Sequence, residues 1–146
     1  MQIEIRMDES CAEPKVIVLT NKVTAEVNAL VRRLSEDAPQ VLVGFRQDSA
    51  EILEQQNVIR IYAEGGKVMA QTAAGTYALR LRLYELEERL DRSCFVRISN
   101  SEIINLKKVK NFDLSFSGTI CVSLANGTVT YVSRRYVARI KQVLGI

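Results

Sequence analysis

The stretch 94–106 (CFVRISNSEIINL) constrains the fold more than any other part of this 146-residue chain. Val96 and Ile98 alternate with Phe95, Arg97 and Ser99, which predicts a strand that points the two sets of side chains to opposite faces. The alternation stops at 99–101, three polar residues whose side chains bond nearby backbone and favour a turn. Apolar residues return beyond that turn, so the sequence predicts a short polar turn held between two apolar anchors.

Three lysines follow this stretch, at Lys107, Lys108 and Lys110. The turn could therefore present the amide of Asn100 to something anionic, with cations beside it. A tight surface loop with a solvated basic flank is the alternative that these residues alone leave open.

Two landmarks give the stretch a wider context. Residues 95–106 fit the pattern Phe-x-Arg-x-x-x-Ser-x-x-Val/Ile-Asn-Leu, and residues 132–136 (VSRRY) form a second landmark after the turn Asn126-Gly127. In this order and spacing they resemble the LytTR DNA-binding domain, a bacterial regulator family, over about residues 51–146. The residues that fall on the first pattern are Phe95, Arg97, Ser101, Ile104, Asn105 and Leu106.

Composition excludes several classes of protein. Apolar residues make up 47% and charged residues 25%, which is ordinary for a globular domain. No apolar run approaches the roughly 18 residues of a membrane span, and the N-terminus alternates instead of forming a signal peptide. Three cysteines without a C-x-x-C spacing, and no histidine, argue against a disulfide framework or a metal site. We expect a cytoplasmic protein without a cofactor.

Charge is distributed unevenly along the chain. Residues 1–57 carry six Lys/Arg and ten Asp/Glu, a net −4, whereas residues 58–146 carry fourteen and seven, a net +7; the two parts sum to the overall +3. A basic C-terminal part joined to an acidic N-terminal part indicates a polyanionic partner for the former only.

The expected fold is α+β. The apolar runs 3–5, 16–19 and 41–45, with a helical stripe over 23–34, predict a small strand–helix–strand module, and Thr20 or Asn21 could cap its helix. Short antiparallel strands and two helices follow, so the C-terminal part is expected to be mostly β. We place a domain boundary at 49/50: residues 1–49 form an extension that could mediate dimerisation, and residues 50–146 form the LytTR-like domain.

An enzyme is not expected. Without histidine there is no imidazole base for a Ser or Cys nucleophile, and no P-loop or G-x-G-x-x-G is present. Candidate cations instead lie on three separate connections, at Lys67, at Lys107 and Lys108, and at Arg134 and Arg135. Lysine is better suited to phosphate, whereas arginine and asparagine can also read base edges.

The resemblance implies that side chains on loops, not a recognition helix, enter successive major grooves of a duplex that bends. By position, it places Asn100 and Arg135 in base contacts and puts Lys67 near a third. On chemistry alone we assign Lys107, Lys108 and Arg134 to the DNA backbone. The hydroxyls of Ser99, Ser101 and Ser133 are assigned there too. For Arg97, a structural ion pair or hydrogen bond is as acceptable as a DNA contact.

The chain has no room for the receiver domain that precedes many LytTR domains, because fifty residues cannot hold that fold. It resembles the receiver-less kind, often encoded beside a small membrane protein, which is a possible regulatory partner. We expect a dimeric transcriptional regulator of double-stranded DNA. The alternatives are a protein-interaction or anti-regulator module, and an RNA-binding protein, for which Tyr62, Tyr77, Tyr84, Phe112 and Phe116 look too much like core.

Overall fold

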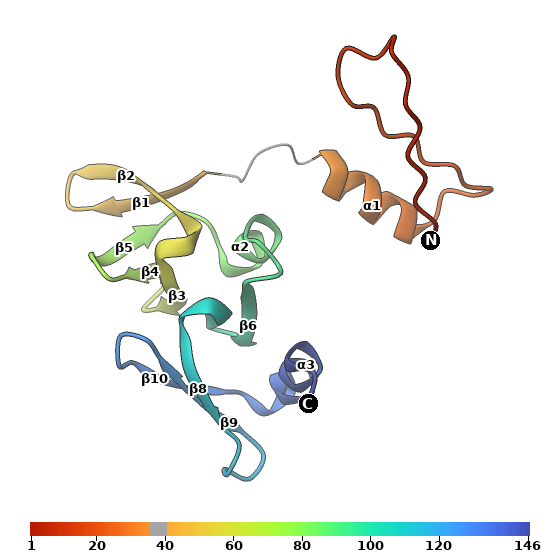
Figure 1. Cartoon of the computed structure of the whole chain (residues 1–146). Helices are drawn as coiled ribbons and strands as arrows, with labels where there is room; N and C mark the ends of the chain where they lie inside the picture. The colour runs from red at the N-terminus through yellow and green to blue at the C-terminus, as the bar shows by residue number, and fades with distance from the viewer. Residues whose placement is uncertain (36–40) are drawn as a thin grey trace. The chain divides into compact units, whose positions relative to one another are not determined.

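The computed structural model describes residues 1–35 and 41–146. The chain divides into two compact units, Met1–Ala38 and Pro39–Ile146, and each is described by itself (Figure 1). No helix in the described residues is long and apolar enough to cross a membrane.

The first unit contains one helix, α1 (Ala25–Ser35), and residues 1–24 form neither helix nor strand. The predicted helix is confirmed, but its first turn is bonded by Thr24, whose Oγ1 accepts from the N–H of Val27 at 3.3 Å, and not by Thr20 or Asn21. The strands predicted at 3–5 and 16–19 are wrong. Apart from the half-buried Val18, their apolar side chains are exposed, and no described strand pairs with either segment. Neither apolar pattern therefore has a sheet to join.

The third expected strand of that module exists as β1 (Leu42–Arg46), but it belongs to the second unit, where it pairs with strands on both sides. The sheet therefore begins before residue 50. The other strands are β2 (Ser49–Leu53), β3 (Val58–Glu64), β4 (Lys67–Thr72), β5 (Gly75–Leu79), β6 (Phe95–Ser99), β7 (Glu102–Asn105), β8 (Val109–Asp113), β9 (Ile120–Leu124) and β10 (Val129–Val132).

These strands form two antiparallel sheets, one with the order β2-β1-β5-β4-β3-β7-β6 and one with the order β10-β9-β8. Two helices accompany them, α2 (Leu83–Arg89) and α3 (Arg134–Leu144), and short 3-10 turns occupy η1 (Gln55–Asn57) and η2 (Leu106–Lys108). The expected α+β class, mostly antiparallel β with two helices in this part, is confirmed.

The β3–β4 hairpin shows why the sequence turns where it does. Gly65 and Gly66 have φ values of +57° and +77°. A two-residue hairpin turn of this kind needs left-handed backbone at both central positions, which glycine adopts without steric cost. The Glu64-Gly-Gly-Lys67 segment therefore closes the hairpin in register, with Glu64 opposite Lys67.

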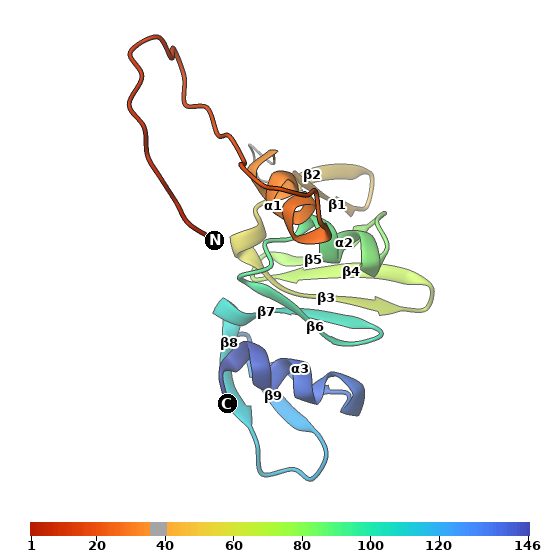
Figure 2. The ribbon, with the colours of Figure 1, turned by 90° about the vertical axis from the view of Figure 1, so that its right-hand side faces the viewer.

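Strands β3, β6 and β7 are buried on both faces, and consecutive side chains feed two different cores. Ile103 joins the core under α2, whereas Ile104 joins the core shared with the three-stranded sheet and α3. Figure 2 shows β7 and β6 at the edge of the larger sheet that lies beside α3. Because consecutive side chains point to opposite faces of a strand, Ile103 and Ile104 together anchor β7 in both cores. The central stretch is thus the joint between the two sheets.

Not all aromatic side chains expected in the core are there. Tyr77 is buried, but Tyr84 is 62% exposed on α2 and Phe116 is 45% exposed. Phe116 packs edge-to-face on Tyr131, with ring centroids 6.0 Å apart. Tyr84 and Phe116 are therefore not core residues, contrary to what was expected when RNA binding was considered.

Candidate nucleic-acid interface

The β6–β7 turn is built from short polar side chains that bond one another. The Oγ of Ser99 accepts from the backbone N–H of Ser101 at 3.2 Å, and the two hydroxyls lie 3.3 Å apart. The register of the pairing between β6 and β7 shifts between Arg97 and Ser99, so β6 is irregular just before the turn. Asn100, at the apex, is exposed.

Arg97 fixes the backbone of this turn. Its Nε donates to the carbonyl oxygen of Ser99 at 2.8 Å, one terminal nitrogen donates to that of Asn100 at 2.6 Å, and the other pairs with the carboxylate of Glu87 on α2. The arginine side chain is only 14% exposed. Of the two roles left open for Arg97, the structure shows the structural one.

The start of α3 lies against the same turn. The backbone N–H of Ser133 donates to the carbonyl oxygen of Ile98 at 2.9 Å, and the hydroxyl of Tyr136 donates to Oδ1 of Asn100 at 3.1 Å. Arg134 and Arg135, in the first turn of α3, are exposed. Asn100 and Arg135 are therefore both exposed, on segments that hydrogen bonds hold together.

Ser133 occupies the expected N-cap position of α3 but makes no side-chain cap bond. Its Oγ is buried without a hydrogen-bond partner, and its N–H is already bonded to Ile98. Neither group is free to meet a phosphate, so the structure does not support the DNA-backbone contact expected for Ser133.

The β3–β4 hairpin reaches the same end of the sheet. The N–H of Ala63 donates to the carbonyl oxygen of Ser101 at 2.8 Å, and Lys67 is exposed at the start of β4. Figure 2 shows the β3–β4 and β6–β7 turns on the same side of the unit. We call the exposed side chains of Lys67, Asn100, Arg134 and Arg135 the turn end.

Lys107 and Lys108 do not belong to the turn end. They lie in η2, which follows β7, whereas the turn precedes it. The four residues of β7 span about 13 Å at the rise of an extended strand. Asn105 holds η2 in place: its Oδ1 accepts from the N–H of Lys107 at 3.0 Å while its buried Nδ2 donates to Val58. The second cationic group is thus separate, and Lys107 is exposed while Lys108 is half-buried.

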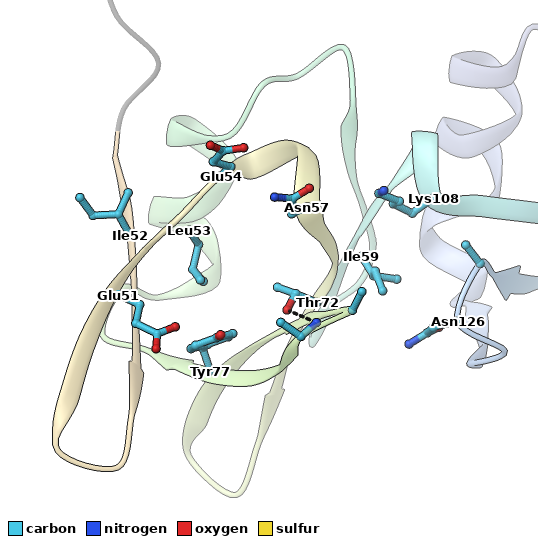
Figure 3. A pocket seen from close by; sticks show the side chains of 13 residues that line it. Glu51, Ile52, Leu53, Glu54, Asn57, Ile59, Thr72, Tyr77, Lys108 and Asn126 are labelled. Carbon is cyan, nitrogen blue, oxygen red and sulfur yellow. Dashed lines mark hydrogen bonds between the residues drawn. The ribbon is translucent and has the colours of Figure 1, made fainter.

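Beside Lys108 lies an open cavity of about 600 Å³ (Figure 3). Its wall carries the carboxylates of Glu51 and Glu54 and the phenol of Tyr77. A hydrogen bond to Glu51 raises the pKa of Tyr77. Sequence reasoning missed this cavity, because its lining residues come from separate segments between residues 51 and 126.

A buried polar group between the two sheets was also not foreseen. Glu102 is 8% exposed; it accepts from the hydroxyl of Thr130 at 2.7 Å and pairs with Arg60 at 3.4 Å. Arg60 in turn donates to Gln71 at 2.9 Å. A buried carboxylate is tolerated when it is paired and hydrogen-bonded, so this network fixes how β10 sits on β7.

Comparisons with known proteins agree with this arrangement. A family model described as the LytTr DNA-binding domain matches residues 48–145. An uncharacterized HTH-type transcriptional regulator of Staphylococcus aureus strain NCTC 8325 is 31% identical over 147 residues, covering 100% of this chain and 99% of the relative, and one of strain MRSA252 is 30% identical with the same coverage.

Among solved structures, the LytTr DNA-binding domain of a putative methyl-accepting/DNA response regulator from Bacillus cereus aligns with a TM-score of 0.72 and 23% identity, over 75% of this chain and 100% of that domain. That likeness establishes the fold. The matched family consists of DNA-binding domains and not of enzymes, in agreement with the expectation from sequence. Although the relatives' names mention a helix-turn-helix, the described helices of this chain are separated along the sequence by strands.

Proposed function

The chain belongs to the LytTR DNA-binding domain family, and from this premise we propose that it regulates transcription by reading double-stranded DNA with loop side chains of the turn end. One observation carries the proposal: Asn100 and Arg135 are both exposed, on segments that are joined by hydrogen bonds from Ser133 and Tyr136 to β6 and its turn.

In this proposal Asn100, Arg135 and Lys67 contact base edges in the major groove. Arginine can donate two parallel hydrogen bonds to guanine, and asparagine can bond purine edges. Lys67 lies on the neighbouring hairpin, so the three residues follow one edge of the unit. Lysine delivers its charge from a flexible stem, and Lys67 would grip a phosphate if no base lies within reach.

The DNA backbone is assigned to Lys107, Lys108 and Arg134, with the hydroxyls of Ser99 and Ser101 beside the base contacts. Phosphate contacts fix register and supply affinity without sequence information. The distance along β7 between the turn and η2 lets one protein molecule touch the duplex at two places. Because about 13 Å is much less than the roughly 34 Å between successive major grooves, we propose that η2 grips phosphates beside the groove that the turn end reads. We propose further that the duplex bends, so that loops of the protein also enter the next major groove.

We further propose that the regulator acts in the cytoplasm as a homodimer on paired sites, with residues 1–49 contributing to dimerisation. Support comes from α1, whose apolar side chains include the exposed Leu34, because an amphipathic helix is stable when its apolar face is covered. A small membrane protein remains a proposed regulatory partner, on family resemblance alone.

Selection from a randomised duplex library tests the proposal. The full-length protein is mixed with the library at moderate salt, and retained duplexes are sequenced. We expect an enriched paired motif and a binding constant whose logarithm falls steeply and linearly with the logarithm of the salt concentration. A protein-interaction module would retain no duplex, and an RNA-binding protein would release the duplex when RNA competes.

A further inference from the structure

The hydrogen bond between Tyr136 and Asn100 bears on which base the protein selects, and this inference rests on the proposed function. The hydroxyl of Tyr136 donates to the side-chain oxygen of Asn100 at 3.1 Å, across 36 positions of sequence and between two elements. It is the side-chain contact that joins the apex of the β6–β7 turn to the first turn of α3.

The rest of Asn100 is already fixed. Arg97 holds its carbonyl oxygen and that of Ser99, so the backbone cannot turn the side chain elsewhere. The amide retains freedom about its two side-chain torsions only, and the bond to Tyr136 removes that freedom. Because Oδ1 is turned toward α3, Nδ2 faces away from it and toward solvent.

The nitrogen and the oxygen of a side-chain amide play different roles at a base edge, because the nitrogen donates hydrogen bonds and the oxygen accepts them. Bidentate pairing with adenine requires the amide oxygen to accept from N6 while the nitrogen donates to N7, whereas guanine offers two acceptors, N7 and O6. The amide oxygen has two lone pairs, and the bond from Tyr136 occupies one of them while holding the oxygen toward α3. The nitrogen is then the atom that the amide presents to a base edge, where it acts as a donor.

We propose that Tyr136 is a specificity-determining residue, which holds Oδ1 of Asn100 so that Asn100 reads guanine in preference to adenine. It acts through Asn100 and is a positioning residue. The phenol itself is half-buried and is assigned no contact with DNA.

The test compares the full-length protein with Tyr136→Phe, which keeps the ring and removes the hydroxyl. The library selection first identifies the base pair whose preference Asn100→Ala relaxes. Two duplexes that differ only there, with guanine or adenine, then compete for the same protein in one tube. The ratio of their affinities is independent of the fraction of protein that is folded, so a loss of stability in the variant does not obscure the result.

For the unsubstituted protein we expect guanine to win by about fivefold or more, the low end of what one good side-chain–base pairing discriminates. Tyr136→Phe should bring the ratio to about one or reverse it. In the Asn100→Ala background the same substitution should change nothing further. Tyr84→Phe, on the exposed face of α2, is the matched control and should keep the original ratio.

The inference is overturned if Tyr136→Phe keeps the original ratio, if it still changes the ratio when Asn100 is absent, or if adenine is preferred at the outset. In each of these cases the protein still selects a sequence, and the proposed function stands. If the unsubstituted protein enriches no sequence from the library, the proposed function has failed, and the inference fails with it.

Discussion

The guanidinium of Arg97 donates to the carbonyl oxygen of Asn100 over 2.6 Å, from the strand that leads into the turn that Asn100 caps. The same group bonds Ser99 and is paired with Glu87 of α2. The half-buried guanidinium thus bonds three acceptors, and it fixes the backbone of the β6–β7 turn in the absence of a partner. A preorganised contact loses less conformational entropy on binding.

Arg97→Lys tests this arrangement. Lysine keeps the charge near Glu87 but cannot present the planar fork that serves both carbonyl groups. We expect the free energy of unfolding to fall by about 1–3 kcal/mol, the value of hydrogen bonds to a charged group, and specific DNA affinity to fall with it. Urea denaturation measures the first quantity and fluorescence anisotropy the second. Arg89→Lys, exposed on α2, is the control and should leave both unchanged; equal stability for the two variants would contradict the role given to Arg97.

Base and backbone contacts should separate in mutational data. Arg135→Ala is expected to cost roughly 1–3 kcal/mol and to relax preference at one base pair, whereas Lys108→Ala should weaken all duplexes alike and lower the salt slope by about 1. Anisotropy titrations on the selected duplex and on a scrambled duplex, each over a range of salt, measure both effects. An equal loss on the two duplexes for Arg135→Ala would remove the base contact from that residue.

The sequence predicted the second unit better than the first. The alternation around Val96 and the polar residues at 99–101 identified β6, the turn and β7, because period-2 patterns and turn chemistry are local. Ile3 and Ile17 show the same kind of local pattern without a sheet to pair with, and the predicted strands there were wrong. Strand formation depends on partners distant in sequence, which a local pattern does not contain.

The candidate site shows the same division. Motif positions predicted the exposed residues of the site, but not the residues that hold them in place. Tyr136 bonds Asn100 across 36 positions of sequence, and the buried Glu102 accepts a hydrogen bond from Thr130 of the other sheet. Ser133 was assigned to the DNA backbone because of its hydroxyl, yet its Oγ is buried. Only the tertiary packing decides whether a polar side chain at such a place faces solvent.

A carboxylate near the start of β6 provides a test against pH. Asp91 Oδ1 accepts from the hydroxyl of Ser93 at 2.7 Å and from its N–H at 2.9 Å, and these bonds lower the pKa of Asp91. A lowered pKa means that the carboxylate stabilises the fold above the unfolded-state pKa, and that this contribution is lost as pH falls through the folded-state value.

Ser93→Ala should therefore raise the pKa of Asp91 toward that of an ordinary aspartate, as measured by an NMR titration of its side-chain carboxyl carbon. Asp113 makes the same pair of bonds with Ser115, and its pKa is lowered for the same reason. It serves as an internal control, because Ser93→Ala should not move its titration. An unchanged titration of Asp91 in this variant would show that the hydroxyl of Ser93 is not what stabilises the carboxylate.

The last prediction concerns α1 and the proposed dimer. Val27 and Leu30 lie on the apolar stripe of this helix, half-buried in the first unit, whereas Asn28 is exposed and lies off the stripe. If α1 packs against a second copy, Leu30→Glu in the full-length protein should yield a monomer in sedimentation velocity, whereas Asn28→Glu, which introduces the same charge, should remain dimeric.

Linking two DNA-binding units raises affinity for paired sites by about 10²–10⁴, so the affinity of Leu30→Glu should fall at least a hundredfold on paired sites and little on a single site. A full-length protein that sediments as a monomer, or a Leu30→Glu variant that is still dimeric, would mean that the apolar stripe is not the dimer contact.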